Sequence, residues 1–87
     1  GDERALGVYR GIYESGRQIP QDVAVLGIDN IPLGQYYYPP ISTVGQDFET
    51  LAKCCINFIV DEIQNGRREG QERIFKFPSK IIERQST

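Results

Sequence analysis

The chain has 87 residues, 39% of them hydrophobic, and a formal net charge of −2 at pH 7. It is long enough for one small domain, and it lacks the general basic surface with which a protein holds nucleic acid. The absence of histidine removes the commonest general base and the commonest metal ligand, and no apolar run is long enough to span a membrane.

An amphipathic helix is predicted over about residues 2–15. Asp2 and Glu3 suit its first turn, where a capping side chain and a carboxylate are both favourable. Apolar residues follow at helical spacing, and Gly16 is typical of a helix end. Pro20 then indicates a short connection to the next element.

The segment 23–28 is continuously apolar, short and rich in β-branched residues. This pattern predicts a strand that is buried on both faces, as in a parallel sheet covered by helices. Residues 29–43 contain prolines and three successive tyrosines and are predicted to be irregular.

A second amphipathic helix is predicted over about residues 47–65, with Gly66 ending it. Two short strands are predicted over residues 73–77 and 80–84. Pro78 separates them, because proline has no N–H group to donate to a strand ladder.

These elements leave the strand 23–28 with too few partners. A buried parallel strand needs parallel neighbours, and no other segment of this chain reads as one. We therefore expect a fragment of a larger α/β protein, with its natural start upstream of Gly1. Alone it should be marginally stable, or stabilised by self-association or strand exchange.

Asp29 is the candidate binding residue, because it follows the buried strand directly. Ligands of open α/β sheets bind outside the carboxyl ends of the strands. A carboxylate there accepts hydrogen bonds from vicinal sugar hydroxyls, or from a base or an amine. The alternative is an aspartate that only caps a loop.

Four aromatic residues are candidates for contacts. Phe48 begins the apolar stripe of the second helix, where it belongs either to the core or to a ligand-stacking surface. Three adjacent tyrosines, Tyr36, Tyr37 and Tyr38, cannot all point inward from a loop, so they suit a protein interface or, alternatively, pack locally in part.

The two cysteines give no metal site. Cys54 and Cys55 are adjacent and lie about 100° apart on a helix, so they cannot chelate a metal by themselves. Cys55 is expected in the core, and two free thiols fit a reducing cytoplasm. No serine nucleophile motif and no glycine-rich phosphate loop occurs, so neither a cofactor nor an enzyme activity is predicted.

The order of short motifs along the whole chain resembles the C-terminal third of the LacI/GalR transcriptional regulators. The motifs are Asp2-Glu3-x-Ala5-x-Gly7, Ile19-Pro20-x-Asp22-Val23-x-Val25-x-Gly27-x-Asp29-Asn30, Pro39-Pro40-Ile41-Ser42-Thr43-Val44-x-Gln46 and Ile82-Glu83-Arg84-x-Ser86-Thr87. The resemblance implies a piece of a two-subdomain core like that of periplasmic binding proteins, with parallel sheets flanked by helices. Residues 1–43 would belong to the C-terminal subdomain, 44–78 to the N-terminal subdomain, and 79–87 would return to the C-terminal one.

The same resemblance implies roles for individual residues. Asp29 occupies the position of the acid that commonly holds sugar hydroxyls, and Phe48 that of an aromatic wall of the effector pocket. Gly1 departs from the asparagine of many members, and Ile28 from the usual tyrosine or phenylalanine. The first helix and the loop before Pro39 match the dimer-forming surface, which includes Leu6, Tyr9, Tyr36, Tyr37 and Tyr38.

The function implied is sensing of a small effector, such as a sugar, in a cytoplasmic, dimeric regulator. Operator DNA would be bound by an N-terminal headpiece outside this chain. One alternative is a periplasmic sugar-binding transport protein, which shares the fold. Another is a phosphoacceptor or hydrolase domain that uses Asp29, for which only Asn30 offers a neighbouring polar group.

Overall fold

The computed structural model describes residues 1–67, 70 and 74–87. They divide into two compact units, which we call the first unit (residues 1–46 and 79–87) and the second unit (residues 47–78). The elements in chain order are α1 (Asp2–Glu14), β1 (Leu26–Ile28), a 3-10 helix η1 (Pro32–Tyr36), β2 (Ser42–Gln46), α2 (Phe48–Asn65) and β3 (Ser79–Ile82).

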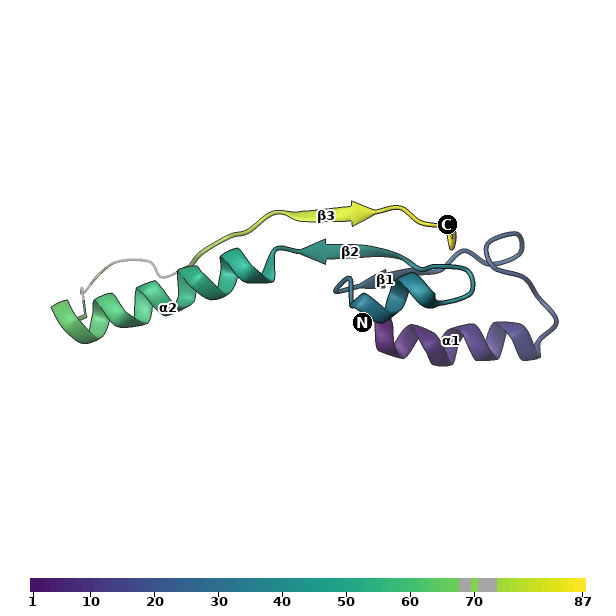
Figure 1. Cartoon of the computed structure of the whole chain (residues 1–87), viewed down its shortest axis with the longest axis horizontal. Helices are drawn as coiled ribbons and strands as arrows, with labels where there is room; N and C mark the ends of the chain where they lie inside the picture. The colour runs from purple at the N-terminus through teal and green to yellow at the C-terminus, as the bar shows by residue number, and fades with distance from the viewer. Residues whose placement is uncertain (68–69, 71–73) are drawn as a thin grey trace. The chain divides into compact units, whose positions relative to one another are not determined.

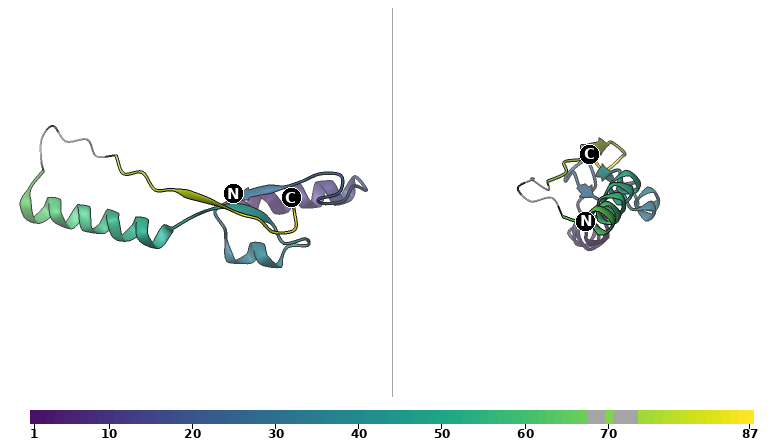
Figure 2. Two further views of the ribbon diagram at one scale, coloured as in Figure 1. Left: turned by 90° about the horizontal axis from the view of Figure 1, so that it is seen from above. Right: turned by 90° about the vertical axis from the view of Figure 1, so that its left-hand side faces the viewer.

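The first unit is built on a three-stranded mixed sheet in the order β1-β2-β3 (Figure 1). β1 runs parallel to β2, with Leu26 opposite Ser42. β3 runs antiparallel to β2, with Gln46 opposite Ser79. Helix α1 contacts β1, and Figure 2 shows the two lying side by side. The α/β class expected from the sequence is confirmed.

Strand β1 differs from its prediction in length and burial. Only residues 26–28 pair with β2, although the whole segment 23–28 was expected to form a strand. Leu26 and Ile28 are each 52% exposed, so the expected burial on both faces is wrong in this chain. The reason is that, within the described residues, β1 has a strand neighbour on one side only.

The core of the first unit lies between α1 and the two segments that lead into β1 and β2. It consists of Ala5, Tyr9, Val25, Tyr37 and Ile41. The Tyr9 and Tyr37 rings meet edge to face, with centroids 5.6 Å apart. Their hydroxyls donate hydrogen bonds of 2.8 Å to the carbonyl oxygens of Pro39 and Asp2, respectively. Both rings can therefore pack in the core, because each phenol hydroxyl has a hydrogen-bond acceptor there.

Burial raises the pKa of both phenols above the ordinary value of 10.0, and the negative charge of Asp2 raises the pKa of Tyr37 further. In the unfolded chain both hydroxyls ionise near pH 10, before they do so in the fold. The contribution of the two protonated phenols to the stability of the fold is thus fully present below pH 10, and it is lost as the pH rises through their folded pKa values.

We therefore expect the free energy of unfolding to fall from about pH 10 upward, as urea titrations between about pH 8 and about pH 11 would measure. Tyr37→Phe should reduce this alkaline loss, because the variant has one fewer phenol to ionise. A stability that stays constant over that range in the unsubstituted protein would contradict the expectation.

The last four residues join the starts of β1 and β2. Ser86, which is fully buried, donates from Oγ to the Val25 carbonyl at 2.6 Å and accepts from the Ser42 amide at 2.7 Å. The Arg84 amide donates to Ser42 Oγ at 2.8 Å. Because the Arg84 amide donates to a side chain and not to a backbone carbonyl of β2, β3 ends at Ile82, although the sequence predicted a strand to residue 84.

The second unit contains α2, whose first turn is capped by Asp47. The Asp47 carboxylate accepts from the Thr50 amide at 3.1 Å and from the Thr50 hydroxyl at 2.7 Å. No residue of α2 is buried, and its apolar stripe is largely open, with Ile63 78% exposed. Cys55 is exposed, so its expected core position is wrong in this chain.

The strand predicted over residues 73–77 is absent where the structure describes it. Residues 74–77 carry no strand, and Arg73 lies outside the described residues. The apolar character of this segment is used instead in a side-chain contact, since the Phe75 and Phe58 rings meet edge to face with centroids 5.4 Å apart. Without a described strand to pair with, an apolar pattern alone does not form a ladder.

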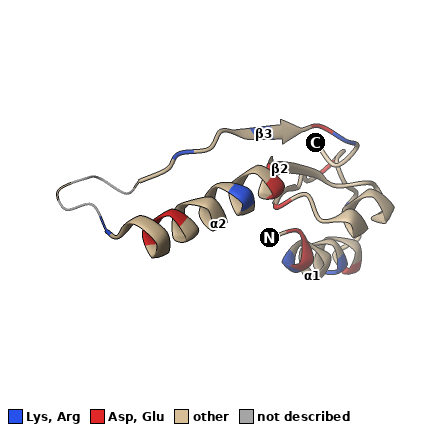
Figure 3. Cartoon of the chain, turned by 60° about the vertical axis from the view of Figure 1, so that its left-hand side comes forward, with Lys and Arg blue, Asp and Glu red and all other residues tan. Residues whose placement is uncertain are grey.

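Charged residues are spread over both helices and the β3 region rather than gathered on one element of the described chain (Figure 3). No helix among the described residues combines the length and apolar character needed to cross a membrane.

Candidate functional site at the end of β1

The candidate acid, Asp29, lies where β1 leaves the sheet. Asp29 has φ 106° and Asn30 φ 54°, so two successive residues other than glycine lie in the left-handed region. This conformation is uncommon and must be held by its surroundings. The Asp29 amide remains in the sheet, donating to the Val44 carbonyl at 2.8 Å. The chain therefore turns sharply immediately after its last sheet bond.

A buried carboxylate from α1 holds the next part of the turn. Asp2, the first residue of α1, is 0% exposed and accepts from the Thr43 hydroxyl at 2.8 Å and the Ile31 amide at 3.0 Å. The Asn30 amide donates to Thr43 Oγ1 at 3.2 Å. We call Asp2, Thr43 and the amides of Asn30 and Ile31 the buried acid network.

The side chain of Asn30 is held by the C-terminal segment. The Arg84 guanidinium donates to Asn30 Oδ1 and to the Ile41 carbonyl, both at 2.9 Å. Asn30 also packs close to Gly45, where an added Cβ would lie 3.4 Å from the Asn30 Cβ. Asp29 is thus held through its backbone amide, whereas Asn30 is held through both its amide and its side chain.

The Asp29 carboxylate itself makes no hydrogen bond or ion pair with the described residues, and its residue is partly exposed. Gly1 lies directly beside it, so that a Cβ on residue 1 would be 2.6 Å from Asp29 Oδ2. Any side chain at position 1 would displace this carboxylate or compete for its space. An open carboxylate on a rigid turn is suited to accept hydrogen bonds from a ligand.

The second predicted ligand contact, Phe48, belongs to the other unit. It is the first residue of α2 and is 49% exposed. The described groups that support Asp29 all come from the first unit, so they do not include Phe48.

The five residues predicted for a dimer surface separate into two groups. Tyr9 and Tyr37 are buried in the core of the first unit, whereas Leu6, Tyr36 and Tyr38 are exposed, Tyr38 by 97%. Tyr37 is the one member of the tyrosine triplet that packs locally, with its hydroxyl bonded to the Asp2 carbonyl.

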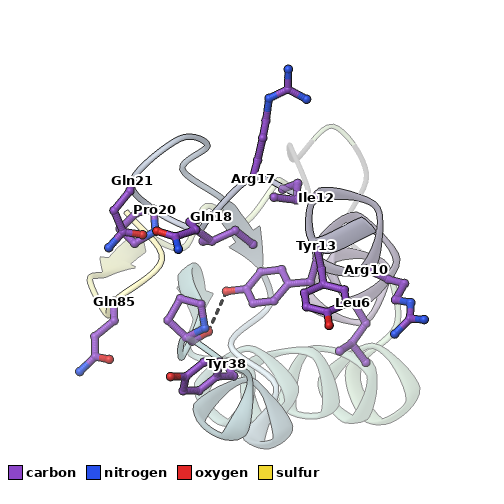
Figure 4. A pocket seen from close by; sticks show the side chains of 13 residues that line it. Leu6, Arg10, Ile12, Tyr13, Arg17, Gln18, Pro20, Gln21, Tyr38 and Gln85 are labelled. Atoms are coloured by element: carbon purple, nitrogen blue, oxygen red, sulfur yellow. Dashed lines mark hydrogen bonds between the residues drawn. The ribbon is translucent and has the colours of Figure 1, made fainter. Parts of the chain in front are cut away.

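A hollow of about 930 Å³ lies on the first unit at α1, away from Asp29, and its lining includes Leu6, Tyr13, Arg17, Tyr38 and Gln85. Figure 4 shows these side chains around the hydrogen bond between Tyr9 and Pro39, which forms part of the wall. The hollow is wide open, and neither Asp29 nor Asn30 lines it. It is therefore a second surface feature rather than the pocket of the candidate acid.

Sequence reasoning missed Asp2, Thr43 and Arg84 as parts of this site. Asp2 was interpreted as a favourable first-turn residue, because its pattern does not reveal that the helix start is buried. The described residues contain no group of three histidine, cysteine, aspartate or glutamate side chains able to hold a metal ion.

Comparisons with known proteins agree on one family. The family model of the periplasmic binding protein-like domain matches residues 1–87. The HTH-type transcriptional repressor PurR of Vibrio atlanticus (strain LGP32) is 34% identical over 83 residues, which cover 95% of this chain and 24% of that relative. The chain thus spans about a quarter of the length of this curated relative.

Solved structures share the fold closely. The LacI family transcriptional regulator from Enterococcus faecalis V583 with bound ribose is 33% identical, with a TM-score of 0.85, over 100% of this chain and 32% of that one. The lac repressor dimer bound to operator and the anti-inducer ONPF is 30% identical, with a TM-score of 0.80, over 95% of this chain and 28% of that one. The resemblance to LacI/GalR regulators is therefore confirmed, and the chain belongs to the periplasmic binding protein-like domain family.

Proposed function

We propose that this chain is the effector-sensing and dimerisation portion of a LacI-type DNA-binding transcriptional regulator that works in the cytoplasm. The observation that carries the proposal is the open Asp29 carboxylate on a rigid turn at the carboxyl end of β1. In an α/β sheet this is where ligands bind. The solved relative that holds ribose supports a sugar or a similar polyhydroxylated effector.

The mechanism we propose is a population shift between two arrangements of the regulator's subdomains. An effector that binds one arrangement more tightly moves the equilibrium by that difference in affinity, and operator affinity changes with it. In this proposal residues 1–43 and 79–87 belong to one subdomain and residues 44–78 to the other, with Phe48 as a wall of the pocket. The division of the described chain into two compact units supports this assignment except at residues 44–46, which belong to the first unit.

The named relatives favour a regulator over a periplasmic transport protein. Those reported above are a transcriptional repressor, a transcriptional regulator and a repressor bound to operator. Operator DNA would be bound by a headpiece that this chain does not include. No catalytic role is proposed for Asp29.

The exposed group of Leu6, Tyr36 and Tyr38 is the part of the chain that we propose faces a second copy. Large amphipathic rings are enriched at protein interfaces, and Leu6 and Tyr38 also line the hollow beside α1. The lac repressor relative is a dimer. Sedimentation of the full-length protein at the mass of a single chain would oppose this assignment.

Asp29→Ala tests the effector site. In the full-length protein we expect this change to abolish the response of operator binding to effector, while operator affinity without effector stays near that of the unsubstituted protein. Each lost hydrogen bond to the carboxylate weakens effector binding roughly tenfold or more. Operator binding by fluorescence anisotropy, with and without D-ribose and a panel of other sugars, measures both quantities.

Asp22→Ala is the matched control. Asp22 is an exposed aspartate before β1 whose carboxylate accepts only from the Gln18 amide among the described residues, at 2.8 Å. It should respond to effector like the unsubstituted protein. An unchanged response in Asp29→Ala would count against the assignment of the pocket.

A further inference from the structure

Two fully buried polar side chains lie behind the candidate ligand acid. Asp2 and Thr43 are both 0% exposed, although each is polar and each comes from a different element. Burial of a carboxylate is costly unless its oxygens accept hydrogen bonds. Both Asp2 oxygens do so here, one from a side chain and one from the backbone.

Asp2 is enclosed so tightly that it cannot touch a ligand itself. A Cβ on Gly27 would overlap Asp2 Oδ1, and a Cβ on Gly34 would lie 2.8 Å from Ile41 Cγ2 and 3.8 Å from Asp2 Oδ2. The absence of a side chain at Gly27 leaves the space that the carboxylate fills. Whatever Asp2 does for a ligand must therefore act through its hydrogen-bond partners.

Three successive backbone amides after β1 are held by groups of β2 and α1. The Asp29 amide donates to the Val44 carbonyl, the Asn30 amide to Thr43 Oγ1, and the Ile31 amide to Asp2 Oδ2. The holding group changes from the backbone of β2 to a side chain of β2 and then to a side chain of α1. These bonds include the amides of both residues with positive φ. Such an uncommon backbone conformation persists only where the surrounding structure holds it.

We propose that Asp2 and Thr43 are positioning residues for Asp29: they hold the left-handed turn that directs its carboxylate outward, so that they set effector affinity without contacting the effector. The affinity part of this inference rests on the proposed function of Asp29. The conformational part does not need a ligand.

Thr43→Val is the decisive variant, because valine keeps the shape of threonine and removes its hydroxyl. The Asn30 amide then loses its acceptor, and Asp2 Oδ1 loses a donor. Thr43→Ser keeps both hydrogen bonds and serves as the conservative rescue. Val25→Ala is the matched control for stability alone, because it truncates the hydrophobic core of the first unit without altering the buried acid network.

The experiment combines residue-resolved amide exchange with calorimetric titration of sugars, D-ribose first, in the full-length protein. In Thr43→Val we expect the Asn30 amide to exchange roughly five- to tenfold faster, with the Asp29 amide unchanged. Affinity for the sugar that the unsubstituted protein binds should fall by a similar factor. Thr43→Ser should return both quantities to normal, and Val25→Ala should leave the affinity unchanged.

Normal exchange at Asn30 in Thr43→Val would overturn the proposal, as would a Thr43→Ser variant that behaves like Thr43→Val. An equal loss of affinity in Val25→Ala would also overturn it, because stability alone would then explain the loss. If Asp29→Ala binds the sugar normally, the proposed function fails instead. The exchange rates at Asn30 still decide whether Thr43 holds the turn.

Discussion

Replacing Asp2 by alanine should lower the free energy of unfolding by about 3 kcal/mol, since a buried donor without a partner costs roughly 1–3 kcal/mol and the change leaves one buried and one part-buried donor without an acceptor. The donors are the Ile31 amide and the Thr43 hydroxyl. Part of the loss is offset, because alanine does not carry the cost of burying a carboxylate. Urea unfolding followed by circular dichroism measures the difference.

Glu3→Ala provides the control for this change. Glu3 is the adjacent acid in the same first turn of α1, and it is exposed. Its loss removes only a favourable interaction with the helix N-terminus, which is typically worth less than about 1 kcal/mol. Equal effects of the two substitutions would show that Asp2 acts as a helix-end charge and not as the centre of a buried network.

Gly27→Ala should destabilise the first unit by about 3 kcal/mol, at the upper end of the usual cost of overpacking a core. The added Cβ would overlap Asp2 Oδ1 and lie 3.0 Å from Ile41 Cδ1, and both of those residues are fully buried. Neither neighbour can move aside into solvent. Thermal and urea unfolding of the variant measure the loss.

Gly7→Ala is the matched control, because a Cβ on Gly7 in α1 meets nothing within 4 Å. That substitution should stabilise the helix by about 0.5–1 kcal/mol. The overlap explanation also requires Gly27→Ala to cost less in a chain that already carries Asp2→Ala, since the overlapping oxygen is then gone. Strict additivity of the two losses would exclude it.

The sequence predicted those features that depend on local pattern. Periodicity placed α1 and α2 within a residue or two of their observed bounds, since each helix is set largely by its own spacing and caps. The position of Asp29 followed from the end of an apolar segment. The turn that holds it did not, because its acceptors, Thr43 and Asp2, lie 13 and 29 residues from the amides they bind.

The wrong predictions share a physical reason. Burial of Leu26, Ile28 and Cys55 was inferred from side-chain chemistry, but burial also requires a neighbouring layer. Within the described residues β1 has one strand neighbour and α2 has no buried residue. The interior positions of Tyr9 and Tyr37 were likewise not visible in the sequence, because they depend on which backbone carbonyls lie within reach of each hydroxyl.

Ser86 has a consequence for how the first unit is made during synthesis. It bonds to Val25, 61 residues earlier, and to Ser42, 44 residues earlier, while residues 47–78 form a separate unit in between. A nascent chain emerges from the ribosome in order, so α1, β1 and β2 are exposed long before their last partner arrives. We infer that, while synthesis has reached only Pro78, the first unit has neither β3 nor its bonds to Ser86. Contacts of such long sequence separation slow folding, so closure of the first unit depends on a segment that is made only after the second unit.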